Sequence, residues 1–502
     1  MPLPGAVPEP VHRSPGPSAR SPRLSLPSAA AWLGLMLNSG GDERLWIDPA
    51  TGRNRYGCPP GPADDEIWLA SSTASAVSAR GWRAADEALT ALADNGPADL
   101  MDGVRGRLLQ IYGVPGAACV LSASGTEAEF IAVALARRLA GDSLTSLVVS
   151  PAETGSGVPA AADGRHFLSS TALGGAPLAS QRLEGLERAD ILTCALEIRG
   201  PDGAVRPAAA VDGEAEAAAR QALAAGRGVL LHVLDCSKTG LSGVSRQAAR
   251  AIVSLDPTLV LAVVDACQLR CDAAQVRADL ADGLAVMITG SKFAGGPPFC
   301  GALLVPPAWA ERLEAGVVLP AGLSDYSARL DWPEAWRAAV GRSLAWPVNL
   351  GLGLRWSAAL AEIEAFEALA PASRRAILDA FEGAVRARVA AAPGLGLLME
   401  PGEGIASIVA IRCGRPAEIV RTAWSRLSES GPAGALAAPC HLGQPVAVGD
   451  ETVLRLCASM PMISAVAERL AEGRDLALAM TPMKADIYRA LTRLELALNE
   501  TA

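Results

Sequence analysis

The sequence predicts an α/β fold built on a mainly parallel sheet of seven strands, with helices on both faces. Seven short apolar runs alternate with helical stretches between residues 118 and 305. The runs are apolar throughout, which is typical of strands that are covered on both faces. The chain has 502 residues, half of them apolar, and is long enough for a large core and at least two domains.

The expected strands, in chain order, are 118–121, 147–149, 191–196, 228–234, 259–264, 285–288 and 302–305. Helical patterns between them cover 127–140, 213–225 and 244–253. In a sheet of this kind, ligands bind beyond the carboxyl ends of the strands. We therefore expect the chemically active side chains just after each apolar run.

The segments around this core differ in composition. Residues 1–27 are rich in Pro, Ser and Arg and are expected to be a disordered tail. We divide the rest into an N-terminal arm with helices (28–115), a large domain (116–330), connecting helices (331–365) and a smaller α/β domain (366–502). In the last we expect helices near 373–391, 416–428 and 484–499, and strands near 407–412 and 453–457.

Bulk composition excludes several classes of protein. The net charge is -9 with both signs interspersed, which argues against a nucleic-acid binder. The ten cysteines are scattered, so neither a disulfide framework nor a metal site is indicated. No apolar run is long enough to span a bilayer. A cytoplasmic protein is the expectation.

The most unusual stretch runs from Met287 to Val305. An apolar run ends at small polar residues, presents Lys292, and continues through a Gly/Pro-dense turn (295–298) into a second apolar run. A lysine held among small residues at a tight turn is a candidate Schiff-base nucleophile. A surface lysine in a hairpin turn explains this stretch equally well.

Two further features lie at ends of expected strands. Ser124-Gly-Thr-Glu127 opens a helix, where small residues let backbone N–H groups reach a phosphate, although the same letters also suit an ordinary capping box. Asp265 follows the apolar run 261–264 directly, and a carboxylate there needs a cationic partner. An anion cradle, an acid and a lysine together are what pyridoxal phosphate requires.

With these motifs the sequence resembles the fold-type I pyridoxal-phosphate enzymes, closest to the class V aminotransferase and cysteine desulfurase group. The resemblance covers residues 117–305 well and the C-terminal part more loosely. Its most specific features are Asp265-Ala-Cys-Gln268 and Thr289-Gly-Ser-Lys292 with the following Gly-Gly-Pro turn. The resemblance also implies a homodimer.

The resemblance implies a role for each matching residue. Lys292 would form the aldimine with the cofactor and move the substrate Cα proton, Asp265 would pair with the pyridine nitrogen, and Gln268 would bond the phenolic oxygen. The phosphate would be held by Gly125, Thr126, Thr289 and Ser291, and the Gly295–Pro298 turn would approach it. Arg455 matches the arginine that binds the substrate carboxylate, with a buried salt bridge as the structural alternative.

The sequence also departs from the family. No aromatic residue or histidine stands where one usually stacks on the pyridine ring, so Thr154 or Glu153 would occupy that position. Asp235-Cys-Ser-Lys-Thr-Gly240 is similar to a substrate loop of class V aminotransferases, which makes Ser237 and Thr239 candidate substrate-binding residues, with Lys238 between them. His232 suits a core histidine as well as a catalytic one.

Two reactions remain open from the sequence. The first is transamination of a small amino acid. The alternative is a cysteine desulfurase or carbon–sulfur lyase that uses Cys440 in a loop before Arg455, with His441 favouring the thiolate. Alternatively, Cys440 is a loop cysteine with no role in a reaction, or the whole protein is a non-catalytic scaffold that retained the fold. Segments 54–62 and 71–75 could cap the substrate pocket.

Overall fold

The computed structural model describes residues 28–314, 316–400, 402–432, 434 and 436–501. The expected disordered tail, 1–27, lies outside these residues. Among the described helices, none is both long and apolar enough to cross a membrane.

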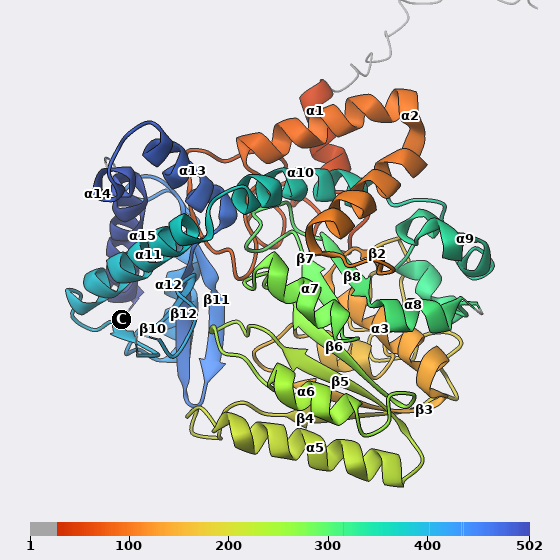
Figure 1. Ribbon diagram of the computed structural model, residues 1–502. Helices are drawn as coiled ribbons and strands as arrows, with labels where there is room; N and C mark the ends of the chain where they lie inside the picture. Colours follow the sequence, from red (N-terminus) through yellow and green to blue (C-terminus); the bar gives the residue numbers. More distant parts are fainter. Residues whose placement is uncertain (1–27, 315, 401, 433, 435, 502) are drawn as a thin grey trace, which may run out of the picture.

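A seven-stranded sheet forms the centre of the larger part of the molecule (Figure 1). Its strands are β2 (Ala118–Ser122), β3 (Ser143–Val149), β4 (Asp190–Leu196), β5 (Gly228–Leu234), β6 (Val260–Ala266), β7 (Ala285–Thr289) and β8 (Gly301–Val305). Their order across the sheet is β2-β8-β7-β6-β5-β3-β4, and only β8 runs antiparallel to its neighbours. The predicted mainly parallel sheet of seven strands is confirmed.

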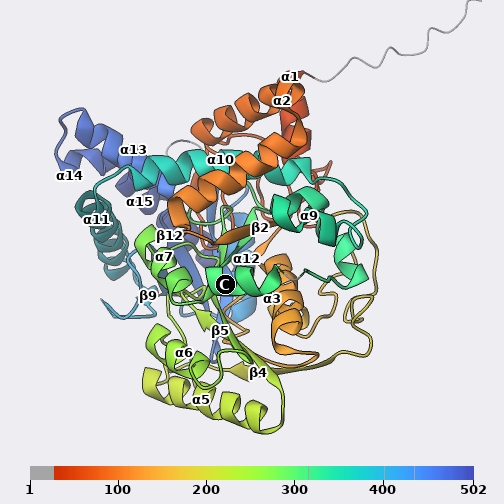
Figure 2. The same ribbon diagram turned by 45° about the vertical axis from the view of Figure 1, so that its right-hand side comes forward.

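Helices cover both faces of this sheet because its strands present apolar side chains to both sides. Leu230 and Val263 face α3 (Gly125–Ala140), whereas Leu231 and Val264 belong to the core on the opposite face. That opposite face is covered by α5 (Ala208–Ala224), α6 (Arg246–Val253) and α7 (Ala273–Ala281). Figure 2 shows α5 and α6 at the end of the molecule remote from α10.

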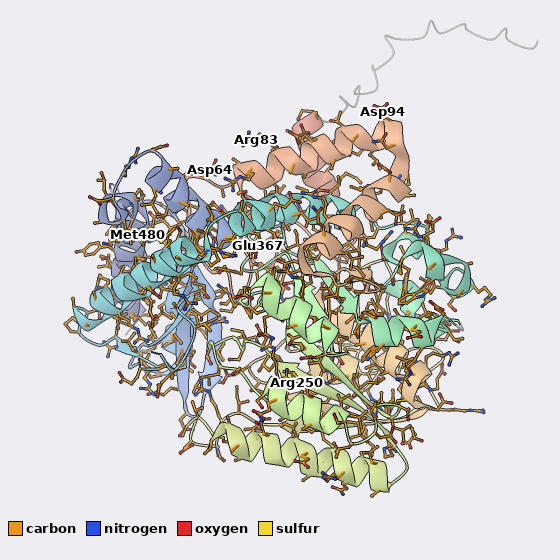
Figure 3. The ribbon with its side chains drawn as sticks, in the orientation of Figure 1. Asp64, Arg83, Asp94, Arg250, Glu367 and Met480 are labelled. Atoms are coloured by element: carbon orange, nitrogen blue, oxygen red, sulfur yellow. The ribbon has the colours of Figure 1, made fainter. Side chains whose placement is uncertain are left out.

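The connecting and peripheral helices complete the larger part. They are α1 (Ala29–Leu37), α2 (Ala79–Tyr112), α4 (Val158–Ala162), α8 (Pro307–Leu313), α9 (Glu334–Val340) and α10 (Leu350–Glu367). The long helix α2 bends at Gly96, whose φ of 79° is non-helical and which precedes Pro97. One side of α2 packs along α10, and its exposed residues include Arg83 and Asp94, which Figure 3 places at the outer edge of the molecule.

The smaller part carries a second, five-stranded sheet in the order β1-β11-β12-β10-β9. Its strands are β1 (Ile67–Leu69), β9 (Gly396–Leu397), β10 (Ile408–Arg412), β11 (Cys440–Val448) and β12 (Glu451–Cys457). The helices of this part are α11 (Pro371–Ala390), α12 (Ala417–Arg426), α13 (Met460–Ala471), α14 (Leu476–Ala479) and α15 (Thr481–Thr501). The strands and helices expected after residue 366 are therefore present.

Strand β1 comes from the N-terminal arm and pairs in parallel with β11, with Ile67 opposite Cys440 and Leu69 opposite Leu442. The expectation of a loop at Cys440–Pro445 was wrong, because this segment pairs with β1 on one side and β12 on the other. A register shift after Gly443 accommodates the glycine and the proline inside the strand. The N-terminal arm is thus an integral part of the second sheet.

Candidate active site

A cavity lies where the carboxyl ends of the central strands meet the N-terminus of α3. All eight residues predicted to hold the cofactor line it: Gly125, Thr126, Thr154, Asp265, Gln268, Thr289, Ser291 and Lys292. They lie at or just after the carboxyl ends of β2, β3, β6 and β7, which are adjacent or nearby in the sheet although distant in sequence. The fold therefore brings the predicted constellation to one place.

The start of α3 provides donors toward this cavity. Ser124 caps the helix by accepting a hydrogen bond from the Glu127 N–H at 3.4 Å, and the first N–H groups of the helix have no intrahelical partners. A Cβ atom on Gly125 would lie 2.5 Å from the Cys267 Sγ, so only glycine lets α3 start this close to the end of β6. This arrangement suits an anion such as a phosphate.

Residues at the carboxyl end of β6 retain unused hydrogen-bonding capacity. Asp265 accepts a bond from the Cys267 N–H at 3.0 Å, and no cation among the described residues lies within salt-bridge distance of it. The Gln268 side chain donates to the Ser72 carbonyl at 3.1 Å, which leaves one amide proton, and its buried Oε1 has no partner. A buried polar atom without a partner at a cavity wall is what a bound ligand would satisfy.

Lys292 lines the cavity at the start of the glycine-rich turn that follows β7. The glycines of this turn serve close packing between helices and the turn: a Cβ on Gly295 would meet Pro461 of α13, and one on Gly296 would meet Ala359 of α10. Pro298 and Phe299 at the end of the turn line the cavity. This close packing of the turn consequently holds the backbone at Lys292 in place.

Glu153 and Thr154 line the cavity where the family usually has a stacked ring. The Glu153 carboxylate pairs with Arg199 and accepts hydrogen bonds from the Ser237 hydroxyl, at 2.7 Å, and from the Thr239 hydroxyl. Ser237 and Thr239 are buried and do not themselves line the cavity. Their observed role is to hold Glu153.

Arg455 lies in β12, directly behind the cavity wall, and only 1% of it is exposed. Its guanidinium donates to the carbonyls of Lys238, at 3.3 Å, and Gln444, and contacts the Thr73 hydroxyl at 3.4 Å; all three of these residues line the cavity. The Nε has no hydrogen-bond partner, and no carboxylate among the described residues pairs with this arginine. Burial lowers the pKa of Arg455 to about 10. A buried salt bridge, the alternative interpretation of this residue, is therefore not what is observed.

Cys440 is outside this group. It is buried in β11, its thiol lies 3.4 Å from the Ala438 carbonyl, and it does not line the cavity. Burial raises the pKa of the Cys440 thiol, which opposes thiolate formation. The neighbouring His441 bonds Glu66 at 2.7 Å and stacks on Trp68 with ring centroids 3.8 Å apart. His441 therefore stabilises the pairing of β11 with β1 and does not contact the Cys440 thiol as a base would.

His232 lies within β5 and is buried between Glu129 and the Leu147 carbonyl, at 2.7 and 2.9 Å. It is a core histidine by its contacts. Burial alone would lower its pKa, but the Glu129 carboxylate beside it raises the pKa above the ordinary value.

Several cavity residues were not predicted as site residues. Arg44, Tyr56, Ser72 and Thr73 come from the N-terminal arm, and Arg44 is paired with Asp42 at 2.6 Å. Three of them fall in segments 54–62 and 71–75, which were expected to cap the pocket. Arg44 carries no local sequence signal, since nothing around it has the pattern of a binding motif.

No family model matches the sequence, and no curated protein is similar enough in sequence to be matched. Solved structures match over most of the chain. A serine palmitoyltransferase from Sphingomonas wittichii is 12% identical, with a TM-score of 0.51 and coverage of 87% of this chain and 88% of that one. A NifS-like protein from Rickettsia africae is 10% identical, with a TM-score of 0.51 and coverage of 87% and 99%.

A ureidoglycine-glyoxylate aminotransferase from Bacillus subtilis is 14% identical, with a TM-score of 0.52 and coverage of 88% and 94%. These three proteins are named for different activities and share the mostly parallel seven-stranded architecture. Identities this low establish the architecture alone. The chain therefore has the fold of the fold-type I pyridoxal-phosphate-dependent enzymes.

Proposed function

We propose that this protein is a pyridoxal-phosphate-dependent enzyme that acts on a small amino acid through Lys292, as an aminotransferase. The observation that carries the proposal is the convergence of Lys292, an unpaired Asp265 and the open N-terminus of α3 on one cavity. Each of these groups has spare charge or hydrogen-bonding capacity of the kind that one part of the cofactor would use.

The residues present fit the cofactor. The phosphate would be held by the N–H groups at Gly125 and Thr126, with Thr289 and Ser291 close by. Asp265 would hold a proton on the pyridine nitrogen, and the remaining amide proton of Gln268 would meet the phenolic oxygen. Thr154 and Glu153 would lie against the ring in place of an aromatic side chain. When bound, the cofactor supplies an aldehyde for amines and an electron sink for the Cα carbanion.

The protein's own groups carry out the proton transfers. Lys292 is the amine that lines the cavity and would accept the proton from the substrate Cα and hold it until it is returned. Arg455 would attract the substrate carboxylate, because it is buried without a counter-charge and lies one residue layer behind the cavity. The Ser237 and Thr239 hydroxyls would position the wall by holding Glu153.

The desulfurase alternative needs a reactive thiol at the cavity. Cys440 is buried away from the cavity with a raised pKa, so neither its place nor its ionisation favours that reaction. Transamination requires no such group. We also infer a homodimer located in the cytoplasm, both from the family resemblance and the composition.

The test is to add pyridoxal phosphate to the purified protein and follow its absorbance while amino acids are supplied one at a time. We expect uptake of one cofactor per chain, borohydride-stable labelling of the Lys292 peptide, and a shift of the absorbance with at least one amino acid. The Lys292→Ala variant should lose the label and the shift, whereas Lys484→Ala, on the exposed side of α15, should keep both. Labelling at another lysine would refute the role of Lys292, and an absorbance that no amino acid changes would refute transamination.

A further inference from the structure

Lysine is scarce in this protein, and its placement is uneven. The chain has 44 basic residues, of which only three are lysines: Lys238, Lys292 and Lys484. Two of the three line the same cavity. Arginine supplies almost every other cation, so the second cavity lysine calls for an explanation of its own.

The turn that carries Lys238 is fixed from both sides. The hydroxyls of Ser237 and Thr239 bond the Glu153 carboxylate, and the Lys238 N–H donates to the Glu153 backbone carbonyl at 2.9 Å. The Ser237 hydroxyl also accepts from the Thr239 and Leu241 N–H groups, both at 3.2 Å. With its neighbours turned toward Glu153, Lys238 presents its side chain to the cavity.

The positive charge of Lys238 is not compensated by any described residue. The carboxylate of Glu153, which acts on the charge of Lys238, is already paired with Arg199. Among the described residues, no carboxylate lies within salt-bridge distance of Lys238. Arg44, which also lines the cavity, is already paired with Asp42, and Lys292 is assigned to the cofactor in the proposed function. Lys238 at the cavity wall and Arg455 behind it are therefore two neighbouring cations without a counter-ion among the described residues.

We propose that Lys238 binds a second anionic group of the substrate, so that the amino acid accepted here carries a side-chain carboxylate. This inference rests on the proposed function, in which Arg455 and Lys292 serve the α-carboxylate and the Cα proton. A neutral side chain would fill the cavity and strip water from the Lys238 ammonium without replacing its interactions, which is costly. A carboxylate would instead form a charge-assisted hydrogen bond with it.

The charge state of Lys238 adds a pH signature. Burial first, and then the positive charges of Arg455 and Lys292, lower its pKa to about 8, while Glu153 acts in the opposite direction. The side chain is a cation below that pH and loses its charge above it. The preference for a dicarboxylate should therefore be full at pH 7 and decline as the pH rises beyond about 8.

Calorimetric titration of the cofactor-loaded protein with succinate and butyrate tests the proposal without turnover. The two acids have the same carbon chain and differ in one carboxylate. We expect succinate to bind about tenfold to a hundredfold more tightly at pH 7, since a charge-assisted bond adds that much. Lys238→Met should bring the two affinities together, Lys238→Arg should keep succinate ahead, and Lys484→Met should match the unaltered protein.

The same variants distinguish this inference from the proposed function. If amino acids shift the cofactor absorbance but succinate and butyrate bind equally, or if Lys238→Met keeps the preference, the inference is overturned and the proposed function stands. If the protein takes up no cofactor, the proposed function fails, and the two acids are then compared on the cofactor-free protein with the same criteria. Far-ultraviolet circular dichroism establishes that each variant is folded before it is titrated.

Discussion

Glu127 is an acidic residue that is buried without a hydrogen-bond partner for its carboxyl group in the part of the chain that the structure describes. It lies in the first turn of α3, is 1% exposed, and neither of its carboxylate oxygens has a hydrogen-bond partner among the described residues. Burial, together with the nearby negative charge of Asp42, raises its pKa from the ordinary 4.5 to about 8. At neutral pH the folded protein therefore keeps this carboxyl protonated.

This environment makes the free energy of unfolding depend on pH. Because the folded pKa is raised, the contribution of Glu127 is full below pH 4.5 and is lost as the pH rises through about 8. The variant Glu127→Gln cannot ionise and should remove this part of the decline, so that it becomes more stable than the unaltered protein above pH 8.

Urea unfolding of the cofactor-free protein between pH 5 and pH 9 measures the difference. The control is Glu472→Gln, at an exposed position, which should follow the unaltered protein throughout. A difference between Glu127→Gln and the unaltered protein that does not change with pH would contradict the assignment.

At the scale of single residues, the sequence revealed those whose chemistry has a local pattern. Asp265 and Lys292 each follow an apolar run that is clearly a strand, so their position at the sheet's edge could be inferred. Arg44 and Tyr56 reach the cavity only because the N-terminal arm folds across it, and no local pattern encodes that path. Lys238 could be singled out from the motif Asp235–Gly240. Its lack of a counter-ion could not be predicted, because it depends on the pairing of Glu153 with Arg199, which the sequence does not show.

Among the elements, the junction between α3 and β6 leaves no room for a side chain at Gly125. Gly125→Ala would place a methyl group 2.5 Å from the Cys267 Sγ and would push the helix start away from the strand end. We expect the affinity for pyridoxal phosphate to fall by at least about tenfold, because the donors at the helix start would be displaced.

Fluorescence titration with pyridoxal phosphate gives this affinity. Adding Cys267→Ala to Gly125→Ala removes the Sγ and leaves the nearest contact at 3.4 Å, so the double variant should regain much of the binding. Gly103→Ala in α2 is the control, since its new methyl group meets nothing within 4 Å and alanine favours a helix. Unchanged affinity in the single variant would show that the helix start is not part of the cradle.

The second sheet shows where element-level prediction failed. Two of its five strands, β10 and β12, have apolar runs and were predicted. The other three were missed, because β1 has only three residues, β9 has only two, and β11 contains glycine and proline. Strand β1 is paired with β11, and β11 is held between β1 and β12. Pairing between segments so distant in sequence is decided by tertiary contacts, which local propensity does not encode.

At the scale of the whole molecule, Arg270 joins three parts of the chain. It follows β6 in the large sheet, donates to the Ser71 hydroxyl of the N-terminal arm at 2.9 Å, and donates to the Ala458 carbonyl after β12 at 3.0 Å. Its guanidinium also lies over the Phe293 ring, 4.4 Å from the centroid. One side chain thus couples both sheets to the arm.

Replacing this residue tests the coupling. Arg270→Met should lower the free energy of unfolding by about 2 kcal/mol, because bonds from a charged donor are lost and the acceptors remain partly buried. Chemical unfolding followed by tryptophan fluorescence and by circular dichroism should then give transitions that no longer coincide.

Arg250→Met is the matched control. Arg250 is labelled in Figure 3 on α6, and it makes an exposed pair with Asp282 at 2.9 Å. Its loss should change stability by no more than about 0.5 kcal/mol. Equal losses in the two variants would mean that Arg270 does not join the parts of the molecule.

The parallel pairing of β1 with β11 also sets an order of events during synthesis. Glu66 and His441, which are bonded across this junction, are separated by 375 residues. At ribosomal rates of roughly 5–20 residues per second, the arm waits on the order of tens of seconds before its partner strand exists. During that interval Thr73, which bonds Gln444 and Arg455, and Ser72, which bonds Cys457, lack these partners, so their part of the cavity wall is among the last parts of the nascent protein to be completed.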